Sequence, residues 1–154
     1  MNLGVQHKAG DEVSSKIARN CLLTRTRQIS RVLTAIYDEE LRPFGITPPQ
    51  FTLLVIIMEL GPLSRSDLGR RNHHDRSTLT RNLQPLIAQG WVSEGVAGDD
   101  GRSRPLSLTE QGKALLHSAV SAWSAAQTKA KALLGEVGAN ALMDIAGELP
   151  RRMS

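Results

Sequence analysis

Residues 64–90 read SRSDLGRRNHHDRSTLTRNLQPLIAQG, a pattern of two short helical segments separated by a polar turn. In the second segment, four apolar residues recur at helical spacing and share one face: Leu79, Leu83, Leu86 and Ile87. The opposite face carries hydrogen-bond donors and acceptors, at Ser77, Thr78, Arg81 and Gln84. Side chains of this kind read base edges in the major groove of DNA. The stretch predicts a helix-turn-helix, and the alternative is an ordinary amphipathic helix pair with a solvated polar face.

The residues that follow favour the first interpretation. Gly90 stands where a helix needs a left-handed C-terminal residue. Two short runs, residues 91–96 and 102–108, flank the turn Ala-Gly-Asp-Asp-Gly at 97–101, which is typical of a β-hairpin. A hairpin directly after such a helix is the wing of a winged helix, with Arg102 and Arg104 near its tip.

Three motifs carry a resemblance to a known family: Asp75-Arg-Ser-Thr-Leu-Thr-Arg81, Asp99-Asp-Gly-Arg102 and Leu108-Thr-Glu-Gln-Gly112. In this order and spacing they resemble the MarR family of bacterial winged-helix transcription regulators, over roughly residues 17–149. The resemblance implies a homodimer that binds a pseudo-palindromic operator in double-stranded DNA. It also implies a repressor that is released by a small ligand or by oxidation.

The expected fold class is mainly α with a small β-hairpin wing, in which N- and C-terminal helices form a dimerisation region. We expect a flexible tail over residues 1–12, because they show no periodicity, and a single domain over 13–154. Its DNA-binding lobe should cover about 47–108. The dimerisation helices should cover about 13–43 and 109–150, with residues 135–140 interrupting the second helical region. Four residues are expected to cap helices at their N-termini, namely Thr47 (with Gln50), Ser64, Asp75 and Thr109.

Composition limits the alternatives. The 154 residues fit one domain, and only 3% of them are aromatic, so the core should be aliphatic. A net charge of +4 fits a polyanionic partner. Residues 61–104 hold seven Arg and no Lys, and arginine suits phosphate and guanine better than lysine does. A single cysteine, no apolar run of membrane-spanning length and no secretory signal predict a cytoplasmic protein without a membrane role.

In a dimer, the second helix of each helix-turn-helix would enter the major groove, and the two grooves would lie about 34–36 Å apart. Base and phosphate contacts are expected from Ser77, Thr78, Arg81 and Gln84, with Arg81 the first candidate for a base. Phosphate contacts are expected from a further set of arginines, Arg65, Arg70, Arg71 and Arg76. Arg102 or Arg104 should reach the minor groove. In the family pattern the wing Asp100 would pair with Arg102, although Gly101 stands where many relatives have another arginine.

Control is expected through a small effector. The resemblance places its pocket near Arg25, Ile29, Phe51, Leu54 and Trp123, where an aromatic acid or a thioester would fit. The alternative for each apolar residue is plain core. Cys21 offers a second possibility, a thiol-based redox sensor, but with Tyr37 as the only tyrosine we favour a buried inert thiol.

Other classes of function find less support. The run His73-His74-Asp75 could suggest a metal site, but adjacent histidines point in different directions and a solvated turn is the preferred interpretation. His73, Asp75 and Ser77 could be drawn as a hydrolytic set, yet no nucleophile elbow or Gly-rich phosphate loop accompanies them. No enzyme activity, cofactor or metal is therefore expected. The remaining alternative is a winged-helix protein-interaction module without DNA binding.

Overall fold

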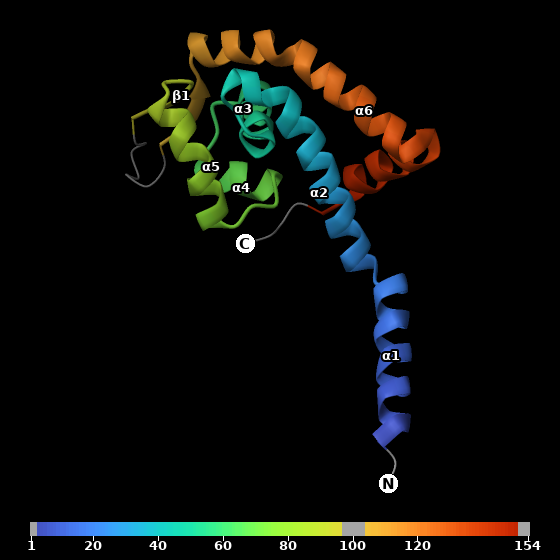
Figure 1. Cartoon of the computed structure of the whole chain (residues 1–154). Coiled ribbons are helices and arrows are strands. Elements are labelled where there is room, and N and C mark those ends of the chain that lie inside the picture. Colours follow the sequence, from blue (N-terminus) through green and yellow to red (C-terminus); the bar gives the residue numbers. More distant parts are fainter. Residues whose placement is uncertain (1–2, 97–103, 151–154) are drawn as a thin grey trace. The chain divides into compact units, whose positions relative to one another are not determined.

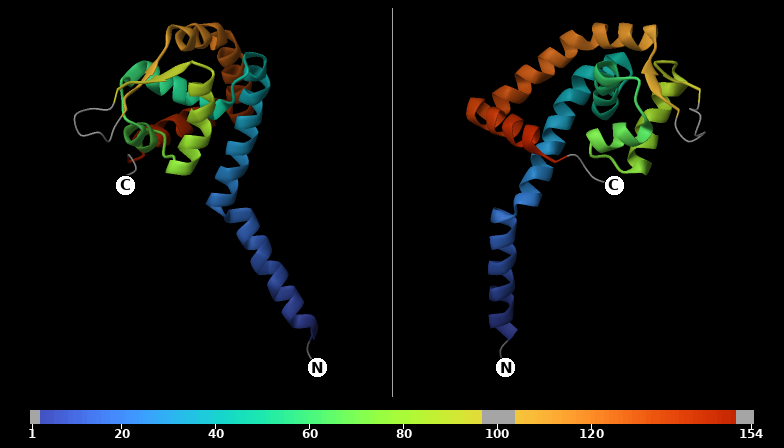
Figure 2. Two further views of the ribbon diagram at one scale, coloured as in Figure 1. Left: turned by 90° about the vertical axis from the view of Figure 1, so that its left-hand side faces the viewer. Right: turned by 180° about the vertical axis from the view of Figure 1, so that it is seen from behind.

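The computed structural model describes residues 3–96 and 104–150 and divides into two compact units, residues 1–35 and 36–154. Figure 1 labels the elements, and Figure 2 gives two further views. Within the described residues, no single helix is long and apolar enough to cross a bilayer. One bent pair, Leu22–Phe44 with Pro48–Leu60, meets those two criteria when its helices are taken together.

The first unit is helical almost throughout. Helix α1 spans Leu3–Asn20, and α2 begins at Leu22 and runs to Leu41 in the second unit. Over residues 3–12 the structure has helix where a tail was expected, because a helix satisfies its own backbone hydrogen bonds. It also divides the expected continuous helix at Cys21. Next to that break the Asn20 side chain donates to the backbone oxygen of Lys16 at 2.9 Å, a local bond that competes with regular helix.

The second unit is built around α3 (Pro48–Leu60), which contacts α4, α5, β2 and α6. The helix begins where its sequence predicts, since Gln50 Oε1 accepts the backbone N–H of Thr47 at 2.9 Å. A short 3-10 helix, η1 (Arg42–Phe44), joins it to the end of α2. Leu53, Leu54 and Ile57 are buried, but Met58 is 43% exposed, so only one face of α3 lies in the core.

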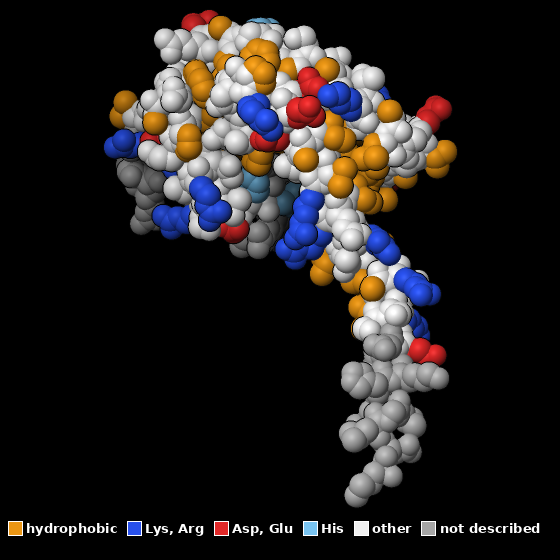
Figure 3. Space-filling view, in the orientation of Figure 1, with side chains coloured by type: hydrophobic (Ala, Val, Ile, Leu, Met, Phe, Trp, Pro, Cys, Tyr) orange, Lys and Arg blue, Asp and Glu red, His pale blue; other side chains and the backbone are white. Residues whose placement is uncertain are grey.

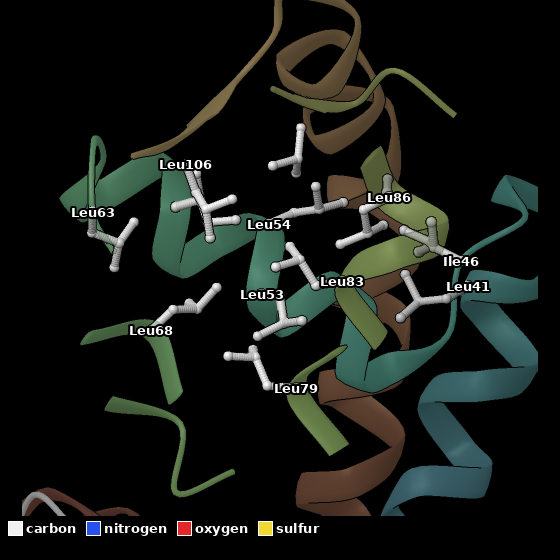
Figure 4. Packing of buried hydrophobic residues seen from close by; sticks show 14 residues of the cluster. Leu41, Ile46, Leu53, Leu54, Leu63, Leu68, Leu79, Leu83, Leu86 and Leu106 are labelled. Atoms are coloured by element: carbon white, nitrogen blue, oxygen red, sulfur yellow. The ribbon is translucent and has the colours of Figure 1, made fainter. Parts of the chain in front are cut away.

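The core is aliphatic, as predicted. It gathers residues from every element around α3, and Figure 4 shows Leu53 and Leu54 among Leu79, Leu83 and Leu86 of α5. Aromatic side chains, including Phe44, Phe51 and Trp91, pack only at its margin. Burial of these leucines fixes which side of α5 faces outward, because the apolar and polar faces of one helix are opposite each other.

Helix α6 spans Glu110–Glu148 and begins in close contact with the end of α5. Thr109 Oγ1 accepts the N–H of Gly112 at 3.1 Å and donates to the carbonyl of Gly90 at 2.7 Å, which confirms the predicted cap. A Cβ at Gly112 would stand 2.1 Å from the carbonyl oxygen of Trp91, so only glycine fits this approach. The helix is broken at Gly135 alone (φ 70°), a shorter interruption than the expected 135–140. One glycine suffices because it adopts a positive φ without strain.

Three polar contacts connect the last residues of α2 to α6, one of them an ion pair between Lys129 and Glu39 at 3.8 Å. Tyr37 donates its hydroxyl to Gln127, and burial raises the pKa of that hydroxyl. Lys129 lies 2.5 Å from Glu40 Oε1, and this hydrogen bond raises the pKa of the lysine. These contacts join the residues after Ile36 to the long C-terminal helix within one unit.

Candidate nucleic-acid interface

Helices α4 (Arg65–Arg71) and α5 (Arg76–Ala88) form the predicted helix-turn-helix. Ser64 Oγ accepts the N–H of Asp67 at 3.0 Å and starts α4, and Asp75 starts α5, both as expected. At the other end of α5, Gly90 has a φ of 74°, and its N–H donates to Ile87 while that of Trp91 donates to Leu86. This pair of bonds is the left-handed helix end that the sequence predicts. Pro85 lies inside the helix without ending it.

The first turn of α5 is held by one carboxylate. Asp75 Oδ1 accepts the N–H of Thr78 and the hydroxyl of Ser77, both at 2.8 Å, and Oδ2 accepts the hydroxyl of Thr78 at 2.8 Å. These bonds, with that from the Thr78 N–H the largest, hold the pKa of Asp75 well below its usual range. Both hydroxyl protons are thus engaged, so Ser77 and Thr78 can offer only acceptor oxygens, and Thr78 its methyl group, to a ligand.

The outward face of α5 presents its long polar side chains to solvent. Arg76, Arg81 and Gln84 are exposed. Within the described part of the chain, no hydrogen bond or ion pair engages the side chain of Arg76 or Arg81. Because an arginine fork has five donors and no acceptor, two unengaged forks on this face favour an anionic or acceptor-rich partner.

Two of the arginines that were expected to contact phosphate have acidic partners in the protein. Arg65 donates from Nε to Glu94 Oε1 at 2.8 Å, and its Nη2 bonds the same oxygen. Arg70 pairs with Asp67 in its own helix and donates to Ser66 Oγ at 2.9 Å. The hydrogen bond from Ser64, and then that from Arg70, lower the pKa of Asp67. Sequence reasoning missed the Arg65–Glu94 pair because its members are 29 residues apart.

The wing follows α5 directly. Strands β1 (Val92–Glu94) and β2 (Leu106–Leu108) pair antiparallel, with Glu94 opposite Leu106. Leu63, which precedes the cap residue Ser64, forms an isolated antiparallel bridge to Leu106 of β2. Arg104 is exposed beside β2. The expected turn at 97–101, Arg102 and the pairing of Asp100 with Arg102 lie outside the described residues.

The turn between α4 and α5 contains the two adjacent histidines. His73 adopts a φ of 51°, and the N–H of His74 donates to the carbonyl of Gly69 at 3.0 Å. Partial burial lowers the pKa of His74, and the neighbouring Asp75 charge opposes this shift. Among the described residues no group of three or more His, Cys, Asp or Glu side chains could hold a metal ion.

The residues predicted to hold an effector are divided between the two units. Leu54 is fully buried in the core, which fits the alternative of plain core for that residue. Phe51 packs at the core margin, and Trp123 of α6 is 40% exposed. Arg25 and Ile29 are exposed on the first unit, where Arg25 donates to Gln28 Oε1 at 3.0 Å.

Cys21 departs from the expected buried thiol. It lies at the break between α1 and α2 and is partly exposed, because this short stretch of helix has no layer packed over it within its own unit. Hydrogen bonds, first from the Thr24 side chain and then from its backbone, lower the pKa of the thiol. The one tyrosine, Tyr37, is hydrogen-bonded to Gln127.

The C-terminal segment of α6 carries exposed apolar side chains. After the break at Gly135, Val137, Ile145 and Leu149 recur at helical spacing and are 85%, 60% and 54% exposed. Figure 3 shows apolar side chains gathered on this segment. An apolar row of this kind is typical of a surface that another protein covers.

Comparisons with known proteins agree with this geometry. The model of the MarR family matches residues 44–103. The organic hydroperoxide resistance transcriptional regulator of Bacillus subtilis is 34% identical over 91 residues, 59% of this chain and 62% of its own length. The chain spans less than two thirds of the length of several curated relatives, this one included.

Two Mycobacterium tuberculosis proteins match more fully. The transcriptional regulator MosR, solved in complex with DNA, is 36% identical over 83% of this chain and 92% of its own, with a TM-score of 0.71. The repressor Rv2887 is 29% identical over 70% of this chain and 77% of its own length. Its structure with p-aminosalicylic acid has a TM-score of 0.62 at 25% identity, and covers 82% of this chain and 96% of that one.

The family model matches the helix-turn-helix and reaches into the wing, and the structural matches extend over the helices on both sides. Both the family and the fold are those of transcription regulators and not of enzymes. The chain belongs to the MarR family of winged-helix transcription regulators.

Proposed function

We propose that this protein is a homodimeric transcription regulator that binds a pseudo-palindromic operator in double-stranded DNA and acts as a repressor. The outward face of α5 carries this proposal, because Arg76 and Arg81 stand exposed there without partners in the described part of the protein. The DNA complex of MosR and the naming of Rv2887 as a repressor lend it support. Such a regulator acts in the cytoplasm, beside the chromosome.

The contacts divide by chemistry. Arg81 and Gln84 reach base edges in the major groove, where a bidentate arginine selects guanine. Ser77 and Thr78 accept hydrogen bonds from base amino groups, because their own protons are engaged by Asp75. Arg76 and Arg71 contact phosphate and add affinity without sequence information. Arg104 extends from the wing into the minor groove.

Dimerisation supplies the second recognition helix. The exposed apolar residues of the C-terminal segment of α6, among them Val137 and Ile145, are the surface that we assign to the partner subunit. Burial of apolar side chains stabilises association by roughly 25 cal/mol for each Å² removed from water. A dimer also places two α5 helices on successive turns of DNA.

The effector that we propose is a small aromatic acid, which would release the DNA. Within the second unit, Phe51 and Trp123 supply partly exposed aromatic surface. The complex of Rv2887 with p-aminosalicylic acid, an aromatic acid, supports this class of ligand.

The test is binding of the purified protein to the DNA upstream of its own gene, titrated in salt. We expect log K to fall with log salt at a slope of about −0.9 for each phosphate contact. Arg81→Ala should weaken binding by at least tenfold, since one bidentate base contact contributes roughly 1–3 kcal/mol. Arg42→Ala, an exposed arginine outside the helix-turn-helix, is the matched control and should bind as the wild type does. A dimer that fails to bind this DNA at low salt would overturn the proposal.

A further inference from the structure

Glu94 occupies an unusual place for a carboxylate. Along β1 the side chains are buried, exposed and half-buried in turn, so Glu94 shares the inward face with Val92. Its cross-strand neighbour, Leu106, is fully buried, and directly opposed residues of an antiparallel pair lie on the same face of the sheet. A partly desolvated carboxylate at such a position requires a partner.

Arg65 is that partner. Its Nε and Nη2 both bond Glu94 Oε1, and the two side chains are 37% and 23% exposed. Arg65 is the first residue of α4, so the pair joins the helix-turn-helix to the wing strand across 29 residues of sequence. No other ion pair within the described residues joins α4 or α5 to the hairpin.

The backbone supports the same junction from the neighbouring strand. Leu63 N–H donates to Leu106 at 3.2 Å, and Leu106 N–H donates back to Leu63 at 2.9 Å. Leu106 is thus bonded on one side to the residue before Ser64, the cap of α4, and paired on the other side with Glu94. The Arg65 side chain adds a bond from α4 to β1, the outer strand of this small sheet.

We propose that Arg65 is a positioning residue for DNA binding and not a phosphate contact. Through Glu94 it holds the wing in a fixed orientation relative to α4 and α5, so that α5 and the wing engage adjacent grooves together. The inference rests on the proposed function for its effect on DNA, but the wing itself can be followed without DNA.

The decisive variant is Glu94→Gln, because the two roles predict opposite signs. If electrostatics alone mattered, removal of an acid near a polyanion would strengthen DNA binding. If Glu94 holds Arg65, its removal loosens the wing and weakens binding. The charge-matched control is Glu59→Gln, an exposed acid of α3 that forms no ion pair within the described residues.

The first measurement is amide hydrogen exchange in the free, full-length protein, followed by NMR. Glu94→Gln should accelerate exchange at Gly95 and Leu106 by about two- to fivefold, the size expected for loss of a partly exposed ion pair, and leave Leu83 in α5 unchanged. The swap Arg65→Glu with Glu94→Arg should restore slow exchange. Unchanged exchange in the wing of Glu94→Gln overturns the proposal, whatever happens to DNA affinity.

The second measurement is affinity for the DNA upstream of the gene. Glu94→Gln and Arg65→Gln should each weaken binding about three- to tenfold, while Glu59→Gln should not. The slope of log K against log salt should stay at the wild-type value, since a phosphate contact would reduce it by nearly one for each subunit. Faster wing exchange with unchanged affinity overturns the positioning role. If the wild type binds no DNA, the proposed function fails, and the exchange data still decide whether the pair holds the wing.

Discussion

At the scale of the residue, Asp75 accepts three hydrogen bonds in the first turn of α5. Its carboxylate accepts the Thr78 N–H, which no helical carbonyl can satisfy, and it orients the hydroxyl groups of Ser77 and Thr78 at the start of α5. We expect Asp75→Ala to lower the melting temperature by about 2–4 °C, as loss of a helix cap does in a protein of this size. Thermal unfolding followed by circular dichroism measures it.

Asp75→Asn is the control for that substitution. Asparagine caps helices about as well as aspartate, so the asparagine variant should melt close to the wild type. Equal melting of the alanine variant and the wild type would show that the cap contributes nothing to stability.

His74 predicts a pH dependence of stability. Burial lowers its pKa in the folded protein, so the unfolded chain binds a proton more readily than the native one. Stability is therefore fully present above the ordinary value of 6.5 and falls as the pH drops from there towards the folded pKa. Asp75 cannot cause this loss, because its lowered pKa keeps its contribution intact down to about pH 3.8.

Urea unfolding between pH 7.5 and 5 tests this prediction. His74→Gln should flatten the fall in the free energy of unfolding over that range. His117→Gln, an exposed histidine on α6, should retain the wild-type fall. A profile for His74→Gln identical to that of the wild type would contradict the assignment.

At the scale of the element, the start of α6 is the tightest junction in the second unit. A Cβ at Gly112 would meet the Trp91 carbonyl at 2.1 Å and a Leu108 methyl at 2.4 Å. Gly112→Ala must therefore push the helix away from the hairpin, and we expect a loss of roughly 2–3 kcal/mol in the free energy of unfolding. Gly138→Ala in the same helix is the control. A Cβ at Gly138 would lie 3.7 Å from its nearest neighbour, the Cβ of Leu134. The substitution should therefore raise the free energy of unfolding by roughly 0.5–1 kcal/mol. Similar effects of the two substitutions would contradict the close approach.

The elements also show what the sequence can predict. Ser64, Asp75 and Thr109 could be assigned as caps because a cap depends on residues within one turn of it. Gly90 could be assigned because a positive φ is a local property of glycine. The recognition face of α5 followed from the burial of its leucines, which their spacing predicts.

The remaining features depend on contacts distant in sequence or on the absence of burial. The Arg65–Glu94 pair could not be predicted, because the register of β1 against β2 and Leu63 decides which residues face inward. The helix over residues 3–12 could not be predicted, because its sequence shows no apolar periodicity. The interruption of α6 was predicted to cover residues 135–140, but only Gly135 is non-helical. The sequence of residues 136–140 contains no signal for the point where the helix resumes.

At the scale of the whole molecule, the net charge and the recognition helix are carried by different parts of the chain. Residues 36–154 hold thirteen Lys and Arg and thirteen Asp and Glu, so the net +4 arises within residues 1–35. The winged-helix lobe, residues 47–108, holds seven Arg and six Asp or Glu, a net charge of only +1, so its attraction for DNA depends on where its charges lie. Within the described residues, pairing of Arg65 with Glu94 and of Arg70 with Asp67 leaves Arg71 of α4 and Arg76 and Arg81 of α5 without an acidic partner.

We therefore expect affinity for DNA to depend on the two lobes of a dimer binding together. The dimer surface can then be tested by measuring how its disruption changes operator affinity. Val137→Glu with Ile145→Glu places two charges on the exposed apolar row of α6. Because a buried unpaired charge is costly, we expect the variant to sediment as a monomer and to lose at least a hundredfold in operator affinity. Val96→Glu is the control, since Val96 is 90% exposed but lies in the wing, and this variant should remain a dimer. A double variant that stays dimeric and binds DNA normally would place the subunit interface elsewhere on the chain.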